Sequence, residues 1–98
     1  MEILYKRRKL EKICTAFDTA VKEYGIDMAE KIHQRIDEIT SAPNSDFLIK
    51  YKIGNCHHLK GNRKNQYAMD LVQPNRLIFE NKNDNIQIAL IEEIIDYH

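Results

Sequence analysis

The spacing of apolar residues changes near residue 45, and this change constrains the fold more than any other feature of the sequence. Before it, Leu10, Ile13, Phe17, Val21 and Tyr24 recur at intervals of three or four residues, which is the spacing of one helical face. After it, short apolar runs are separated by turn-forming residues, which is typical of strands. The chain therefore predicts helices followed by strands, an α+β fold.

The first half predicts a helical hairpin. Its first helix covers residues 10–24 and stops at Gly25, because glycine adopts a positive φ without strain. Asp27 is expected to cap the second helix, with Glu30 three residues later in the capping-box position. Pro43 ends that helix, since proline cannot continue the hydrogen-bond ladder. The apolar face of the second helix consists of Met28, Ile32, Ile36 and Ile39.

The strands predicted outside the hairpin pair into one sheet. Short turns join most of them, so neighbouring strands are expected to be antiparallel and both helices to cover one face, giving two layers. With 98 residues, we expect one domain spanning residues 1–98. The predicted strands are residues 2–6, 47–53, 67–72 and 76–80, and one that begins at residue 86 and whose end the alternation does not define.

Charge is balanced over the whole chain and uneven along it. Fifteen basic and fifteen acidic residues give a formal net charge of zero, which argues against strong nonspecific binding to nucleic acid. Residues 47–69 contain no acid, however, and this window predicts a surface for a polyanion, although a solvated face is the ordinary alternative. Its RNA-binding candidates are Lys50, Lys52, Arg63 and Lys64.

Several classes of protein are disfavoured. No apolar run approaches the roughly 20 residues that span a bilayer, and the start of the chain lacks a signal-like apolar region, so we expect a cytoplasmic protein without membrane partners. Cys14 and Cys56 are far apart, which fits thiols in a reducing compartment. Cys56, His57 and His58 would point to alternate faces of a strand, and no metal motif or phosphate-binding glycine loop occurs. We therefore expect no metal and no cofactor.

The remaining polar groups suit cleavage of RNA without a metal. That reaction needs a base for the 2′-hydroxyl, an acid for the leaving oxygen and cations for the phosphorane. His57 can carry a proton near neutral pH, and Lys60, Arg63 and Arg76 can supply positive charge. The C-terminal triplet Asp96-Tyr97-His98 offers a carboxylate, a phenol and an imidazole. Against this, a single histidine or a polar chain end more often has no catalytic role.

Three segments together resemble the HigB branch of the RelE/ParE toxin superfamily. These are the run from Gly54 to Tyr67 (GNCHHLKGNRKNQY), the run from Pro74 to Glu80 (PNRLIFE) and the closing Asp96-Tyr97-His98. The resemblance implies a bacterial type II toxin with a microbial-RNase-like fold that cuts messenger RNA in the ribosomal A site without a metal. It also implies neutralisation by a cognate, HigA-like antitoxin, through which alone the protein would contact DNA.

The resemblance assigns functional roles to positions that match the HigB motifs. His98 would transfer a proton and His57 would be the second proton carrier, with the acid and the base left unassigned between them. Arg76 would stabilise the phosphorane, and Arg63 would be an additional phosphate contact. The full set of catalytic candidates is His57, Lys60, Arg76, Asp96, Tyr97 and His98.

In the same scheme, Lys60 helps Arg76 to stabilise the phosphorane. Asp96 takes the 2′-hydroxyl proton or orients its neighbours, and Tyr97 stacks on a nucleotide. We expect the chain end to fold beside the cationic loop that contains Lys60, so that one scissile phosphate meets all these groups.

Two other functions remain open at this point. A ParE-like poison of DNA gyrase would use the same fold without ribonuclease groups, and the C-terminal triplet argues against it. A non-catalytic module could instead bind an antitoxin within a repressor complex. Growth arrest and cleaved messages on expression would separate the endoribonuclease from both.

Overall fold

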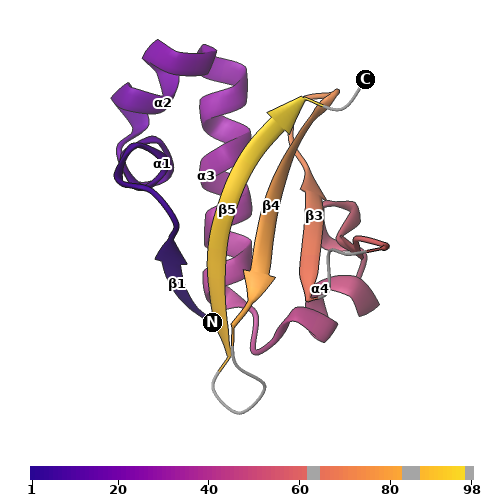
Figure 1. Cartoon of the computed structure of the whole chain (residues 1–98). Helices are drawn as coiled ribbons and strands as arrows, with labels where there is room; N and C mark the ends of the chain where they lie inside the picture. The colour runs from indigo at the N-terminus through magenta and orange to yellow at the C-terminus, as the bar shows by residue number, and fades with distance from the viewer. Residues whose placement is uncertain (62–64, 83–86, 97–98) are drawn as a thin grey trace.

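A computed structural model describes residues 1–61, 65–82 and 87–96. Strands and helices follow one another in the order expected for an α+β chain (Figure 1). The elements are β1 (Glu2–Tyr5), α1 (Arg8–Thr15), α2 (Phe17–Tyr24), α3 (Ile26–Ser41), α4 (Ser45–Lys50), the 3-10 helix η1 (Ile53–Asn55), β2 (His57–His58), β3 (Gln66–Asp70), β4 (Asn75–Asn81) and β5 (Ile88–Asp96).

The five strands form one sheet in the order β1-β5-β4-β3-β2. The pairings among β2, β3, β4 and β5 are antiparallel, and only β1 pairs in parallel, with β5. Figure 1 shows α3 behind β5, β4 and β3, and none of the helices of the described residues lies in front of these strands. The predicted two-layer α+β fold with an antiparallel-rich sheet is confirmed.

The core lies between the sheet and the helices. Fully buried side chains of β4 and β5, among them Leu77, Phe79 and Ile91, meet Ile32 and Ile39 of α3. Burying a side chain of this size contributes about 1.5–3 kcal/mol, so these contacts hold the sheet against α3. As predicted, Met28 and Ile36 also lie on the buried side of α3, Ile36 only in part.

The helical hairpin differs in detail from its prediction. The single helix expected over residues 10–24 is wrong, because the extended backbone of Ala16 (φ −117°, ψ 108°) separates α1 from α2. Gly25 ends α2 at a φ of +87°, as predicted. The expected cap by Asp27 is also wrong, since α3 already begins at Ile26 and no side chain caps it.

The strand predicted over residues 47–53 is wrong. The segment forms α4 and η1, because the Asn44 side chain accepts a hydrogen bond from Phe47 N at 2.8 Å and so caps a helix. Leu48 is fully buried while Tyr51 is exposed, so helical packing replaces the apparent alternation. After α4, Lys52 takes a positive φ of 53° immediately before η1.

The later strands are confirmed with small shifts at their ends. β3 lies where a strand was predicted over residues 67–72, and β4 lies where one was predicted over residues 76–80. β5 runs to Asp96, and a register shift opposite Ile78 and Phe79 breaks its alternation, which explains why its end could not be predicted. Within the described ranges, no helix is both long and apolar enough to cross a membrane.

Candidate active site on the outer face of the sheet

The candidate site lies on the face of β5, β4 and β3 turned away from α3, called the outer face below (Figure 1). Directly paired residues of antiparallel strands present their side chains on the same face. Asp70 pairs with Arg76, and His57 pairs with Ala68. Because Ala68 and Asp70 are two residues apart on one strand, all these side chains share the outer face.

Asp70 and Arg76 form an ion pair across β3 and β4. Arg76 Nε lies 3.6 Å from Asp70 Oδ1, and about a quarter to a third of each side chain is exposed. The carboxylate also accepts a hydrogen bond from Asn55 Nδ2 at 3.2 Å. The guanidinium is therefore held in place and remains accessible, as a phosphate-binding arginine must be.

Asn55 connects His57 to the same cluster. The Asn55 carbonyl oxygen lies 2.9 Å from His57 Nδ1. Since a carbonyl can only accept, Nδ1 carries the hydrogen and Nε2 of a neutral ring has the free lone pair. A proton-accepting nitrogen, a carboxylate and a guanidinium are thus joined through Asn55, which adopts a positive φ of 54°.

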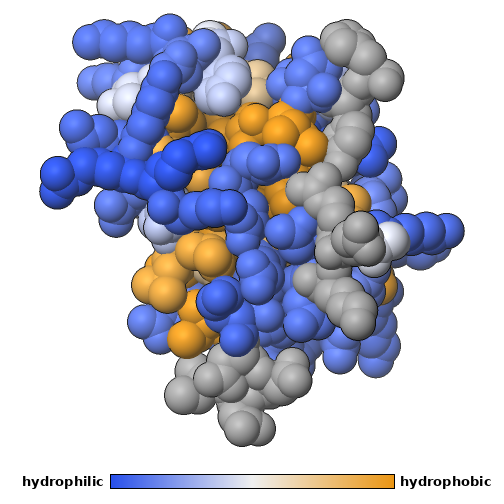
Figure 2. Space-filling view, viewed as in Figure 1, coloured by the Kyte–Doolittle hydropathy of each residue, from blue (hydrophilic) through white to orange (hydrophobic). Residues whose placement is uncertain are grey.

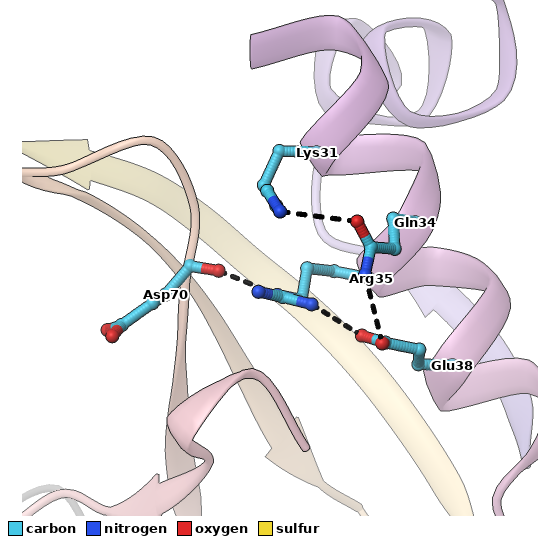
Figure 3. A network of polar contacts seen from close by, with 5 residues as sticks. All are labelled: Lys31, Gln34, Arg35, Glu38 and Asp70. Atoms are coloured by element: carbon cyan, nitrogen blue, oxygen red, sulfur yellow. Dashed lines mark hydrogen bonds and ion pairs between the residues drawn. The ribbon is translucent and has the colours of Figure 1, made fainter. Parts of the chain in front are cut away.

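The helix layer supports this cluster from behind. Arg35 of α3 donates a hydrogen bond from Nε to the Asp70 carbonyl oxygen at 2.6 Å and forms an ion pair with Glu38 at 2.8 Å. Figure 3 shows the Arg35 side chain reaching from α3 to β3, while the Asp70 carboxylate points away from it. Only 8% of Arg35 is exposed. Arg35 therefore connects the end of β3 to α3, and the Asp70 carboxylate stays on the outer face.

Gly54 allows the approach of Arg35. A Cβ atom at Gly54 would lie 2.6 Å from Arg35 Nε, and the backbone there has a φ of +58°. Glycine is required at such a position for both reasons, the conformation and the close approach. The turn that carries Asn55 is therefore packed directly on the Arg35 guanidinium.

Asp96 reaches the same end of the sheet. It is the last residue of β5 and pairs with Asn75, the neighbour of Arg76. Adjacent strands lie about 4.8 Å apart, so the Asp96 backbone is close to that of Arg76. Of the predicted C-terminal triplet, Tyr97 and His98 lie outside the described residues.

Lys60 lies toward the other end of the sheet. Leu59 N donates a hydrogen bond to Gln66 O, which places Lys60 beyond the start of β3. From Gln66 to Asp70 is four residues, or about 13 Å along a strand. The backbone therefore does not bring Lys60 into the row of Asp70 and Arg76.

The predicted RNA-binding lysines come from α4 and the turn after it. Lys50 and Lys52 are both exposed, and Lys50 Nζ lies 5.4 Å from the centre of the Tyr51 ring. Lys50 is the last residue of α4 and Lys52 immediately precedes η1. The prediction that both belong to a strand is wrong. Arg63 and Lys64 lie outside the described residues.

Sequence reasoning missed Asp70, Asn55 and Arg35. A signal for Asp70 was available, because a turn at residues 73–75 makes the flanking positions 70 and 76 partners in a hairpin. Asn55 and Arg35 left no such signal. Their roles depend on a turn conformation and on a helix that crosses behind the sheet.

A second polar cluster lies along β4 and β5. Glu80 and Glu92 form a side-chain hydrogen bond with each other, which raises the pKa of Glu80. The pKa of Glu92 is lowered, since bonds from Lys6 and Glu80 outweigh the effect of burial. Lys6 Nζ lies 3.0 Å from Glu92 and Lys82 Nζ lies 3.9 Å from Glu80. Glu92 sits where the register shifts, the kind of bulge that redirects a side chain.

Neither cysteine is a candidate nucleophile. Burial raises the pKa of the Cys14 and Cys56 thiols to about 12, so the reactive thiolate is absent near neutral pH. Cys56 is buried. Among the side chains that the structure describes, no three His, Cys, Asp or Glu residues are grouped so that they could hold a metal ion.

The fold is shared with a solved structure of another protein. The solved structure of a YoeB/ParE toxin from Agrobacterium tumefaciens superposes with a TM-score of 0.70 and 13% sequence identity, covering 100% of both chains. No protein-family model matches the chain, and no curated protein matches its sequence. At this identity the likeness establishes the fold, which agrees with the RelE/ParE-type architecture that the motifs predicted.

Proposed function

We propose that the protein is the toxin of a type II toxin–antitoxin system, of the HigB type, and that it cleaves messenger RNA on the ribosome. The proposal rests on the cluster of His57, Asp70 and Arg76 on the outer face. The fold shared with a YoeB/ParE toxin and the HigB-like motifs support the same class of protein.

In the proposed reaction, the 2′-hydroxyl oxygen attacks the adjacent phosphorus. The new P–O2′ bond forms while the P–O5′ bond breaks, which leaves a 2′,3′-cyclic phosphate and a 5′-hydroxyl end. His57 Nε2 takes the 2′-hydroxyl proton, because its other nitrogen is engaged with the Asn55 carbonyl. Arg76 stabilises the charge that develops on the phosphorane.

With His57 as the base, the remaining roles go to the other residues of the sequence motifs. His98 gives a proton to the departing 5′-oxygen, Tyr97 stacks on a nucleotide and Asp96 orients its neighbours. Lys60 would contact a phosphate farther along the RNA, since its backbone lies more than about 13 Å from the row of Asp70 and Arg76.

The deciding experiment is primer extension on messages from cells in which the chain is expressed. Cuts within translated codons would support the endoribonuclease, and Arg76→Ala and His98→Ala should abolish them. Damaged DNA with intact messages would identify a gyrase poison and refute the proposal. Normal growth under strong expression would instead favour a non-catalytic module.

The proposed partner is a cognate, HigA-like antitoxin. Expression of the neighbouring open reading frame should relieve the growth arrest and copurify with the chain. Any contact with operator DNA is expected only through that partner. Unchanged growth arrest on coexpression would contradict this part of the proposal.

A further inference from the structure

A basic run lies where β1 is followed by α1. Residues 6–9 read Lys-Arg-Arg-Lys, and all four are exposed. The two lysines are paired with carboxylates at 3.0 and 2.9 Å. In the part of the chain that the structure describes, Arg7 and Arg8 form no ion pair. Figure 2 shows strongly hydrophilic side chains projecting over α1, next to an apolar area over the upper part of β5.

One of these two arginines lines a cavity and the other does not. The cavity has a volume of about 360 Å³, which is within the range of small-ligand pockets. It lies between α1, α2 and the last part of β5. Its lining consists of Arg7, Lys9, Leu10, Ile13, Glu23, Tyr24 and Ile94.

The lining combines positive charge, an aromatic ring and an apolar floor. Arg7 and Lys9 contribute two positive charges and Glu23 one negative charge, which leaves a net charge of +1. Because Lys9 pairs with Glu23 at 2.9 Å, Arg7 is the cation available to a ligand. The Tyr24 side chain is partly exposed, at 37%. Leu10 and Ile13 are buried beneath them.

The cavity and the candidate active site lie on opposite faces of β5, one residue apart along the strand. Ile94 lines the cavity, and the following residue, Ile95, pairs with Arg76. Consecutive residues of a strand point to opposite faces of the sheet. A single strand of RNA whose phosphate contacts Arg76 would therefore reach the cavity by passing around the end of β5.

We infer that this cavity binds one nucleotide of single-stranded RNA, with its phosphate on Arg7 and its base against the Tyr24 ring. The inference rests on the proposed function, because it assigns a second subsite to the same substrate. A guanidinium binds phosphate by paired hydrogen bonds, and aromatic rings stack on unpaired bases. An acidic peptide would use the charge of Arg7 and Arg8 alike and would not require the ring.

The test measures binding of a short fluorescein-labelled single-stranded RNA to the purified chain by fluorescence anisotropy. Arg7→Ala should weaken binding about tenfold, since it removes a charge-assisted hydrogen bond. Arg8→Ala removes the same charge one residue away from the cavity lining and is the matched control. It should weaken binding by less than about twofold, because only screened attraction is lost.

Two substitutions of Tyr24 distinguish base stacking on the ring from attraction to the charge of Arg7. Tyr24→Leu should weaken binding about tenfold by loss of the ring, whereas Tyr24→Phe keeps the ring and should bind within about twofold of the original chain. Thermal unfolding of each variant checks that the fold is retained. Equal effects of Arg7→Ala and Arg8→Ala, or no effect of Tyr24→Leu, would overturn the inference.

Three further outcomes are decisive. If an acidic peptide bound with dependence on Arg7 while RNA did not bind, the cavity would be a protein-docking site and the inference would be wrong. If RNA bound as expected but expressing cells showed no cut messages, the proposed function would fail and the nucleotide subsite would stand. Cut messages with unchanged binding by Arg7→Ala would refute the subsite alone.

Discussion

Replacing Gly54 by alanine tests the support that Arg35 gives to the candidate site. The added Cβ would lie 2.6 Å from Arg35 Nε and 2.9 Å from Arg35 Cδ and Cζ. These distances are well inside van der Waals contact, so the guanidinium has to move. Arg35 is only 8% exposed and is bonded to both Asp70 and Glu38. Its displacement therefore breaks the 2.6 Å bond to the Asp70 carbonyl.

The expected cost has two parts. An alanine at the φ of +58° found at Gly54 costs about 1 kcal/mol. Loss of a hydrogen bond from a charged donor costs about 1.5–3 kcal/mol. The free energy of unfolding should therefore fall by about 3 kcal/mol, which corresponds to a decrease in Tm of roughly 12–24 °C for a domain of this size.

Gly61→Ala is the matched control. Gly61 also has a positive φ, of +78°, but an added Cβ there would meet nothing within 4 Å. It should cost only the conformational part, about 1 kcal/mol. Urea unfolding followed by circular dichroism measures both variants against the original chain. Equal destabilisation by the two substitutions would refute the proposed contact between Gly54 and Arg35.

A second substitution, at Arg35, tests the contact between the added Cβ and the Arg35 side chain by itself. In a chain that carries Arg35→Met, Gly54→Ala should cost only about 1 kcal/mol, because the flexible side chain can move aside. A cost of about 3 kcal/mol in both backgrounds would show that the strain at Gly54 is purely that of the backbone.

Three other predictions follow from the polar groups. Asp70→Asn keeps an acceptor for the turn but removes the charge beside the guanidinium, so cleavage should fall about tenfold with little change in Tm; unaltered growth arrest would contradict this. Glu80→Gln should stabilise the chain near pH 7 and have little effect near pH 4, measured by urea unfolding. The hydrogen bond with Glu92 raises the pKa of Glu80, so its stabilising contribution is present at low pH and is lost as the pH rises through the raised value; a stability–pH profile unchanged in the variant would argue against it. Cys14 and Cys56 have pKa values raised to about 12, so a thiol reagent should label them only after unfolding, and rapid labelling of the native protein would disprove this.

The spacing of apolar residues predicts the helices of the first half but not the break between α1 and α2. The spacing of Leu10, Ile13 and Val21 correctly predicts helix on both sides of Ala16, because one apolar stripe continues through α1 and α2. It does not predict the break, since Ala16 is a good helix former. The extended backbone at Ala16 is a property of the packed structure and cannot be predicted from the alanine side chain.

The segment from Ser45 to Ile53 shows a conflict between two local signals. Aromatic and branched residues favour a strand, whereas Asn44 is a good N-cap. Burial of Leu48 in the core decides for the helix, and that burial depends on elements far away in the sequence. The same helix leads into the turn that presents Asn55 to the outer face.

The printed sequence by itself determined the class of fold and the polar groups in its motifs, because periodicity and turn residues act over a few neighbours. It also identified His57 and Arg76 as candidates. Only the tertiary structure decided that Asp70 and Asn55 join these two residues and that Arg35 supports them from the helix layer. The Asn55–Asp70 and Arg35–Asp70 contacts span 15 and 35 positions of the chain, separations over which local patterns carry no information. They form because packing brings α3, β3 and the turn at Gly54 together.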